Sequence, residues 1–382
     1  MIPFKTLHVA PQGRSRSIIS VCLAALALTS SASADRIDLI SGEPIEDCVI
    51  VTETMSEVTY KESDRGKNKT VPSANVLSIE YTSVPNDVQA ADVAVKDQEF
   101  GVAFELYEGY LTEHLEGRPE RRKLWAPAYV AHQLVGLNVL VGERADAIKA
   151  ADLLISKFPD SRYLPNAYMT KATVQAEDGD AAGAKDTLEK LEKLIIKQDL
   201  PQRFGLECRL FKILIDTGLV GDARRKELRG VETDAGGEFP TVRNRATVAI
   251  GESFLMEASQ GDGGAKALGE ARTHFEDVIK DPSADDETIA GAYTGLGDCL
   301  FQVAATSKDE DDIREALMTN MRVVVLYRDE VRYAPKAMFY AGRCFNLKGG
   351  PEDIERANKL YNRIIRNHDG TKWADEARSF RK

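Results

Sequence analysis

The apolar positions of this chain follow two different periods, and the change between them divides the sequence. Residues 35–82 carry short β-branched runs that alternate with polar positions, with turn residues at intervals of about ten, which predicts a small antiparallel barrel or sheet. From residue 86 onward the apolar residues recur at helical spacing, as in Phe100, Phe104 and Tyr107. The pattern therefore predicts a mainly α protein that begins with a small β-unit.

The helix-length patterns come in pairs, and residues typical of turns separate the pairs. The first pair is predicted at 90–115 and 125–141. Six further helical hairpins are predicted at Glu143–Asp178, Asp180–Thr217, Asp222–Ser259, Ala265–Thr306, Asp309–Lys348 and Glu352–Lys382. A helix–turn–helix unit repeated at about forty residues is typical of a helical solenoid. We therefore expect a right-handed superhelix of about seven hairpins.

One stretch recurs within this pattern. Phe158-Pro159-Asp160-Ser161-Arg162-Tyr163-Leu164-Pro165-Asn166-Ala167 is echoed by Arg332-Tyr333-Ala334-Pro335-Lys336-Ala337, with Arg, Tyr, Pro and Ala in register. Small residues also align at three positions of the second helices. The first position holds Ala167, Ala246, Ala292 and Ala337. Five residues later come Ala172, Gly251, Gly297 and Gly342, and seven residues after the first position come Val174, Ser253, Cys299 and Cys344. Small side chains allow neighbouring helices to approach closely, so each second helix is predicted to be packed on both sides.

These residues carry a resemblance to a known family. Phe158-Pro159-Asp160-Ser161 followed by Ala167-Tyr168, with Gly297-Asp298-Cys299 and Gly342-Arg343-Cys344, resembles tetratricopeptide repeats (TPRs) of the bacterial cell envelope. The repeats are similar to those of the Tol-Pal-associated cell-division coordinator and the outer-membrane assembly lipoprotein. The repeat lengths of about 39 to 46 residues exceed the usual 34, and the anchoring cysteine of the lipoprotein is absent.

The resemblance implies a fold and a mode of action, which is to hold a protein or peptide partner on a concave surface. In such repeats that surface is lined mainly by first helices. The residues that this geometry would place there include Lys149, Asp152, Arg314 and Arg322. The sequence does not identify the partner-binding residues beyond this.

The first 34 residues have the features of a secretory signal peptide. Basic residues precede the apolar run Ile18–Leu28, and Ala32-Ser33-Ala34 predicts cleavage between Ala34 and Asp35. The run is too short to span a bilayer, and Cys22 lies inside it, so no lipid anchor is expected. The predicted parts are the signal peptide 1–34, a β-domain 35–84 and a helical repeat domain 85–382, in an exported protein that is periplasmic or extracellular.

The net charge of the chain bears on its partners, and the spacing of its cysteines bears on whether they form disulfides. The chain has 61 acidic and 50 basic residues, a net charge of −11, and an acidic surface repels nucleic acid. No later segment has the ~18 apolar residues that a membrane helix needs. Cys299 and Cys344 fall at equivalent positions of stacked helices, about 9–10 Å apart, beyond the ~7 Å limit for a disulfide. We therefore expect Cys48, Cys208, Cys299 and Cys344 to be buried, unpaired thiols.

No motif for catalysis, a metal or a cofactor emerges from the residues. His114, His132, His274 and His368 are isolated, without the spacing of metal ligands. The segment Asp178–Glu189 resembles a calcium loop but has Ala182 where a third ligand belongs, so it is predicted to be a turn and helix cap. Phosphate-binding loops and nucleophile elbows are absent from the sequence.

Three functions therefore remain open. The first is an exported, non-catalytic protein–protein interaction scaffold or adaptor. The second is a carrier or assembly factor for outer-membrane or secreted polypeptides, which would bind many extended clients. The third is a glycan-binding or hydrolytic module located in the β-unit, which would lose binding when Asp35–Thr82 is deleted.

Overall fold

The computed structural model describes residues 34–40, 42–63, 65–117, 123–259, 264–328, 330 and 332–381. Apart from Ala34, the predicted signal peptide lies outside these residues, as do most of the predicted breaks at 117–120 and 261–264. Asp35, the first residue after the predicted cleavage site, begins the first strand, and its carboxylate accepts hydrogen bonds from the backbone amides of Ile50 (3.0 Å) and Thr82 (2.9 Å). Cleavage itself stays a prediction.

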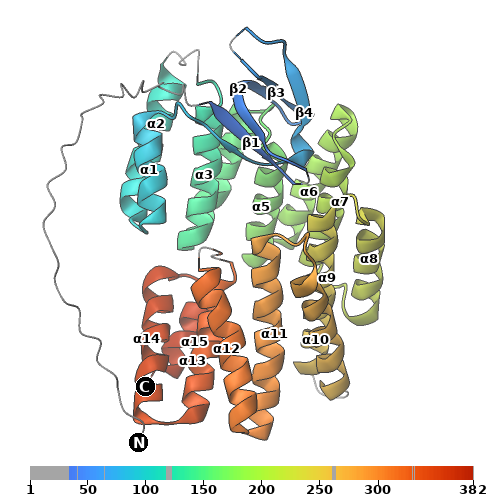
Figure 1. The fold of residues 1–382 in the computed structure, drawn as a ribbon, viewed down its shortest axis with the longest axis vertical. Helices are drawn as coiled ribbons and strands as arrows, with labels where there is room; N and C mark the ends of the chain where they lie inside the picture. The colour runs from blue at the N-terminus through green and yellow to red at the C-terminus, as the bar shows by residue number, and fades with distance from the viewer. Residues whose placement is uncertain are drawn as a thin grey trace, which may run out of the picture. The chain divides into compact units, whose positions relative to one another are not determined.

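Five strands form one antiparallel sheet in the order β4-β3-β2-β1-β5 (Figure 1). They are β1 (Asp35–Leu39), β2 (Ile45–Glu53), β3 (Glu57–Lys61), β4 (Lys69–Pro72) and β5 (Val76–Glu80), with a short 3₁₀ turn at Ser73–Asn75 before β5. Alternate side chains of the strands, among them Ile37, Cys48 and Val58, bury one small core. The predicted β-unit is therefore confirmed in the form of a sheet.

Helices make up the rest of the described chain, and they are paired. Helix α1 (Asn86–Lys96) is followed by the hairpins α2–α3 (Phe100–Glu116, Ala126–Val141), α4–α5 (Arg144–Lys157, Leu164–Glu177), α6–α7 (Ala181–Gln198, Gln202–Ile215), α8–α9 (Gly221–Ala235, Pro240–Ser259), α10–α11 (Gly264–Lys280, Asp286–Ser307), α12–α13 (Glu310–Leu326, Ala334–Lys348) and α14–α15 (Pro351–Asn367, Lys372–Phe380). The mainly α class and the seven hairpins are confirmed.

The sequence prediction was wrong at the first helix. The stretch 90–115 was expected to be one helix, but it contains the end of α1 and nearly all of α2, which pack against each other. Gln98 breaks the helix with a left-handed backbone conformation, φ 63°, which is uncommon for a non-glycine residue. The reversal buries Val88 and Ala91 of α1 in the same core as Tyr107 of α2.

The aligned small residues of the second helices each receive a large side chain from the next first helix. A Cβ added to Gly251 would lie 2.8 Å from the Phe275 ring, and one on Gly342 would lie 2.6 Å from the Tyr361 ring. Gly297 has the same relation to Asn320 of α12. The predicted close packing on both sides of these helices is confirmed.

Two other local predictions are also confirmed. Cys48, Cys208, Cys299 and Cys344, the cysteines within the described residues, are buried and form no disulfide. Asp180 accepts a hydrogen bond from the Gly183 amide at 2.9 Å, and α6 starts directly after it. The helix cap predicted at this segment is therefore confirmed.

Turns at the ends of the N-terminal helices contact the end of α14 and the turn that follows it. The Asn367 side-chain amide donates to Oε1 of Gln98 at 3.1 Å. Gly142, which ends α3 with φ 85°, packs so closely on Asp369 that a Cβ would lie 2.7 Å from the Asp369 carbonyl oxygen. In Figure 1, the ends of α1 and α3 lie next to the ends of α14 and α15. The row of hairpins therefore closes on itself and encloses space between its second helices.

Candidate binding cavity

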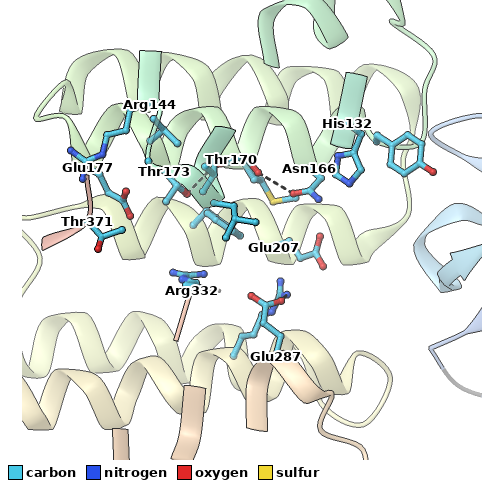
Figure 2. A pocket seen from close by; sticks show the side chains of 18 of the residues that line it. His132, Arg144, Asn166, Thr170, Thr173, Glu177, Glu207, Glu287, Arg332 and Thr371 are labelled. Carbon is cyan, nitrogen blue, oxygen red and sulfur yellow. Dashed lines mark hydrogen bonds and ion pairs between the residues drawn. The ribbon is translucent and has the colours of Figure 1, made fainter. Parts of the chain in front are cut away.

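A cavity of about 830 Å³ lies between the second helices of the hairpins. Its wall includes residues of α3, α5, α7, α9, α11, α13 and α15, with Ser73, Val76 and Leu77 of the β-unit at one side. Figure 2 shows Arg332 and Glu287 facing Glu207 and Thr170 across the cavity, with Arg144, Glu177 and Thr371 at one end and His132 at the other. The second helices of this solenoid thus line a partly open cavity.

The expectation that first helices line this surface was wrong. Arg144, at the start of α4, is the one lining residue from a first helix of a hairpin among the described residues. The four candidates Lys149, Asp152, Arg314 and Arg322 are exposed and do not line the cavity. The reason is the closure of the hairpins, because it turns the second helices inward and leaves the first helices outside.

The cavity wall carries more positive than negative side chains. Its charged residues are Arg144, Arg162, Arg203, Arg245, Arg332 and Lys372 against Glu177, Glu207 and Glu287. The two histidines in the wall add no charge near pH 7, because burial lowers the pKa of both His132 and His368 to about 4. Two of the arginines pair with carboxylates that lie outside the wall, Arg144 with Asp178 and Arg162 with Glu53.

Most of these cations already have a protein partner. Arg203 of α7 lies 2.8 Å from Glu207 and donates to the Ala74 carbonyl at 2.6 Å. Arg245 of α9 forms an ion pair with Glu287 of α11. Burial alone would lower the pKa of Arg245, and the carboxylates of Glu287 and Glu207 reverse that effect, so its pKa is raised. The Arg203–Ala74 hydrogen bond and the Arg245–Glu287 ion pair therefore connect neighbouring elements around the cavity.

The first copy of the repeated Arg-Tyr motif joins the β-unit to the helices. Nε of Arg162 lies 2.7 Å from Oε2 of Glu53, at the end of β2, and both side chains are largely buried. The Tyr81 hydroxyl donates to the same carboxylate, and Arg162 also donates to the Tyr163 hydroxyl at 2.9 Å. Burial raises the pKa of Glu53, and the Arg162 guanidinium and the Tyr81 hydroxyl oppose that shift.

The second copy has no such partner. Arg332 stands in the turn before α13, as Arg162 does before α5. Its side chain is exposed to the cavity, and its guanidinium lies over the Tyr333 ring, 5.7 Å from the centroid. The Tyr333 hydroxyl and the carboxylates of Glu252 and Glu287 raise the pKa of Arg332, and burial opposes that shift. Lys372 likewise contacts only the ring of Trp373, at 4.8 Å, in the part of the chain that is described.

The candidate metal ligands and histidines are spread over the described residues. Within the described residues, no three His, Cys, Asp or Glu side chains are placed to hold a metal ion. His132 and His368 lie in the wall, while His274 stacks on Phe254 and His114 on Tyr110. None of the described helices is both long and apolar enough to cross a bilayer.

The sequence contained a signal for some of these residues. Arg162 and Arg332 belong to the repeated motif, although it was interpreted only as a turn. Glu207, Arg245 and Glu287 carried no signal, because their shared position depends on how α7, α9 and α11 stack.

The chain is similar to known proteins in structure and not in sequence. No family model matches the chain, and no curated protein sequence matches it. A tetratricopeptide repeat protein from Parabacteroides merdae has a TM-score of 0.39 at 11% identity, covering 77% of this chain and 97% of its own.

Two further solved structures cover 77% of this chain with a TM-score of 0.40. One is a signal-transduction ATPase with a tetratricopeptide repeat sensor from Pyrococcus horikoshii, at 14% identity over 43% of its length. The other is the human IFIT1 dimer with m7Gppp-AAAA, at 12% identity over 71% of its length. Similarity at this level carries no argument about function, so the helical-repeat assignment rests on the hairpins themselves.

Proposed function

We propose that this protein is an exported, non-catalytic adaptor that holds a segment of a partner polypeptide in its central cavity. The observation that carries the proposal is the cavity of about 830 Å³ between the second helices. Its volume falls within the range of about 300–1,000 Å³ typical of ligand sites. A cavity that already exists before binding saves ordering entropy, which favours affinity.

The lining residues suit a peptide segment. Asn166, Thr170 and Thr173 lie one helical turn apart along α5 and present amide and hydroxyl groups to the cavity. Such groups can satisfy the donors and acceptors of an extended backbone. Leu140, Phe204 and Trp373 add apolar surface to the same wall, which would hold a side chain. Export is proposed from the leader sequence, and it predicts that the mature protein begins at Asp35.

A substitution that fills the cavity tests this proposal. Asn166 is exposed within the cavity wall, so Asn166→Trp should occupy space that a bound segment needs. The partner is identified first by chemical crosslinking and mass spectrometry in the source cells, and its affinity for the purified variant is then measured. We expect a loss of at least about tenfold in affinity.

The matched control is Lys149→Trp, which places the same bulk on the exposed face of α4. This variant should bind the partner as the wild type does. Equal binding by both variants would contradict the proposal, provided that circular dichroism shows both to be folded. A spread of extended clients in the crosslinking experiment, in place of one dominant partner, would favour the carrier function over the adaptor.

A further inference from the structure

The repeated Arg-Tyr motif occupies equivalent positions in two hairpins. Arg162 and Arg332 each stand in the turn that leads into a second helix, and the tyrosine that follows each of them caps that helix. Pro165 and Pro335 come next in both copies, within the first turn, where proline is tolerated. Both arginines line the central cavity. The same backbone geometry therefore presents a guanidinium to the cavity twice.

In the first copy the guanidinium holds a carboxylate. Arg162 is 2.7 Å from Oε2 of Glu53 and stacks on the Tyr163 ring at 4.4 Å from its centroid. Arginine presents five donors in a planar fork that matches a carboxylate. The arginine of this turn thus binds the carboxylate of a nearby acidic side chain.

In the second copy, no carboxylate of the described residues forms an ion pair with Arg332. No hydrogen bond or ion pair joins Arg332 to another described residue, and its guanidinium lies over Tyr333. The neighbouring carboxylate of Glu287 is already held by Arg245. The carboxylates of Glu252 and Glu287 also act on Arg332, but neither forms an ion pair with it. Its donors therefore remain available for a ligand.

A second, smaller cavity lies beside Arg332. A side cavity of about 180 Å³ adjoins the central cavity and shares Arg245, Glu287 and Arg332 with it. The charged residues that line it are Arg224, Arg245 and Arg332 against Glu252 and Glu287. Asp216 acts on Arg224, and Glu207 and Asp285 act on Arg245, from outside this side cavity. Arg332 is the arginine of this group that has neither an ion pair nor a hydrogen bond within the described residues, and partly enclosed charges are stable when they are paired.

We propose that Arg332 binds a carboxylate of the ligand held in the central cavity, in the way that Arg162 binds Glu53. This inference rests on the proposed function, because it names the chemical group that the cavity recognises. The carboxylate belongs to an acidic side chain of a bound peptide or to a small dicarboxylate. Both sources present the same group to the same guanidinium.

Residue-specific labelling tests the site on the whole mature chain. Phenylglyoxal modifies accessible arginines, and mass spectrometry follows the rate at Arg332 in the presence of glutarate, glutaramide, inorganic phosphate, hexaglutamate or hexaglutamine at constant ionic strength. We expect saturating glutarate or hexaglutamate to slow modification of Arg332 at least about fivefold, while the uncharged analogues have no effect. Arg314 on the outer face of α12 is the internal control and should react equally in all conditions.

The outcomes separate the alternatives. Protection by hexaglutamate places the carboxylate on a polypeptide, and protection by glutarate alone places it on a small molecule. Equal rates with glutarate and glutaramide, or equal protection by phosphate, would overturn the assignment of a carboxylate site. The proposed function fails separately, because it is measured by partner binding to Asn166→Trp. An Arg332→Gln variant adds a second measurement, since glutarate should raise the melting temperature of the wild type and not that of the variant.

Discussion

At the scale of single residues, glycine positions decide how closely the helices stack. Gly342 of α13 faces Tyr361 of α14, which is fully buried and accepts a hydrogen bond from the Asn346 side chain at 3.0 Å. The ring cannot move aside without breaking this arrangement. The glycine is therefore required by packing, although an α-helix as such favours alanine.

Gly342→Ala should destabilise the protein by about 1–2 kcal/mol, because overpacking in a core costs more than the helix propensity returns. Urea unfolding of the purified protein measures the change. Gly269→Ala is the matched control, since Gly269 is helical and exposed, with no atom within 4 Å of the added Cβ. It should leave stability unchanged or raise it by up to about 1 kcal/mol. A Gly342→Ala variant as stable as the wild type would contradict the packing account.

At the scale of elements, a buried ion pair and an aromatic stack attach the β-unit to the helices. The Glu53–Arg162 pair joins β2 to the start of α5. Tyr81, just after β5, stacks on Trp125 with 3.5 Å between the ring centroids. Met55 and Ala74 pack with Leu200 and Phe204 of the α6–α7 hairpin. The small sheet thus has its own core, and this second apolar cluster adds burial between the β-unit and the helices, which a unit of this size needs.

Glu53→Gln should destabilise the protein by about 3–5 kcal/mol, because it leaves the Arg162 charge buried without a counterion. Trp125 fluorescence should report the loss, since its stacking partner Tyr81 also donates a hydrogen bond to Glu53. Asp146→Asn serves as the control because the Lys149–Asp146 pair is exposed, and it should change stability by less than about 1 kcal/mol. Equal effects of the two substitutions would show that Glu53 does not anchor the sheet.

The sequence predicted elements better than it predicted their arrangement. Periodicity and turn residues located the sheet and the seven hairpins, since both signals are local. The break at Gln98 was missed because a left-handed glutamine has no sequence signature. The cavity could not be predicted, because contacts such as Asn367 to Gln98 join residues far apart in the chain. The candidate residues on first helices were therefore placed on the wrong face.

At the scale of the whole described chain, closure of the hairpins depends on buried groups at the junction. His368 lies at the end of α14, next to the Asp369–Gly370 turn that packs on Gly142. Its side chain is buried, and burial followed by the charge of Arg363 lowers its pKa to about 4. Protonation at this position would place a charge where the two ends of the helical region meet.

This pKa predicts how stability depends on pH. The folded pKa of about 4 lies below the unfolded value of about 6.5, so the unfolded state binds more protons between them and stability falls as pH falls. His368 should contribute a loss of about 2 kcal/mol between pH 7.5 and 5. Urea unfolding of His368→Gln across this range should show a shallower decline than that of the wild type. Identical slopes for the two proteins would contradict a buried, neutral His368.

The most direct test of the central claim is site-specific photo-crosslinking of the partner polypeptide. A photoreactive amino acid replaces either Thr170, which faces the cavity, or Lys149, which is exposed on the outer face of α4. If the partner is held between the second helices, the Thr170 position should crosslink to it and the Lys149 position should not. Crosslinking from Lys149 alone would contradict the account and return the binding surface to the first helices.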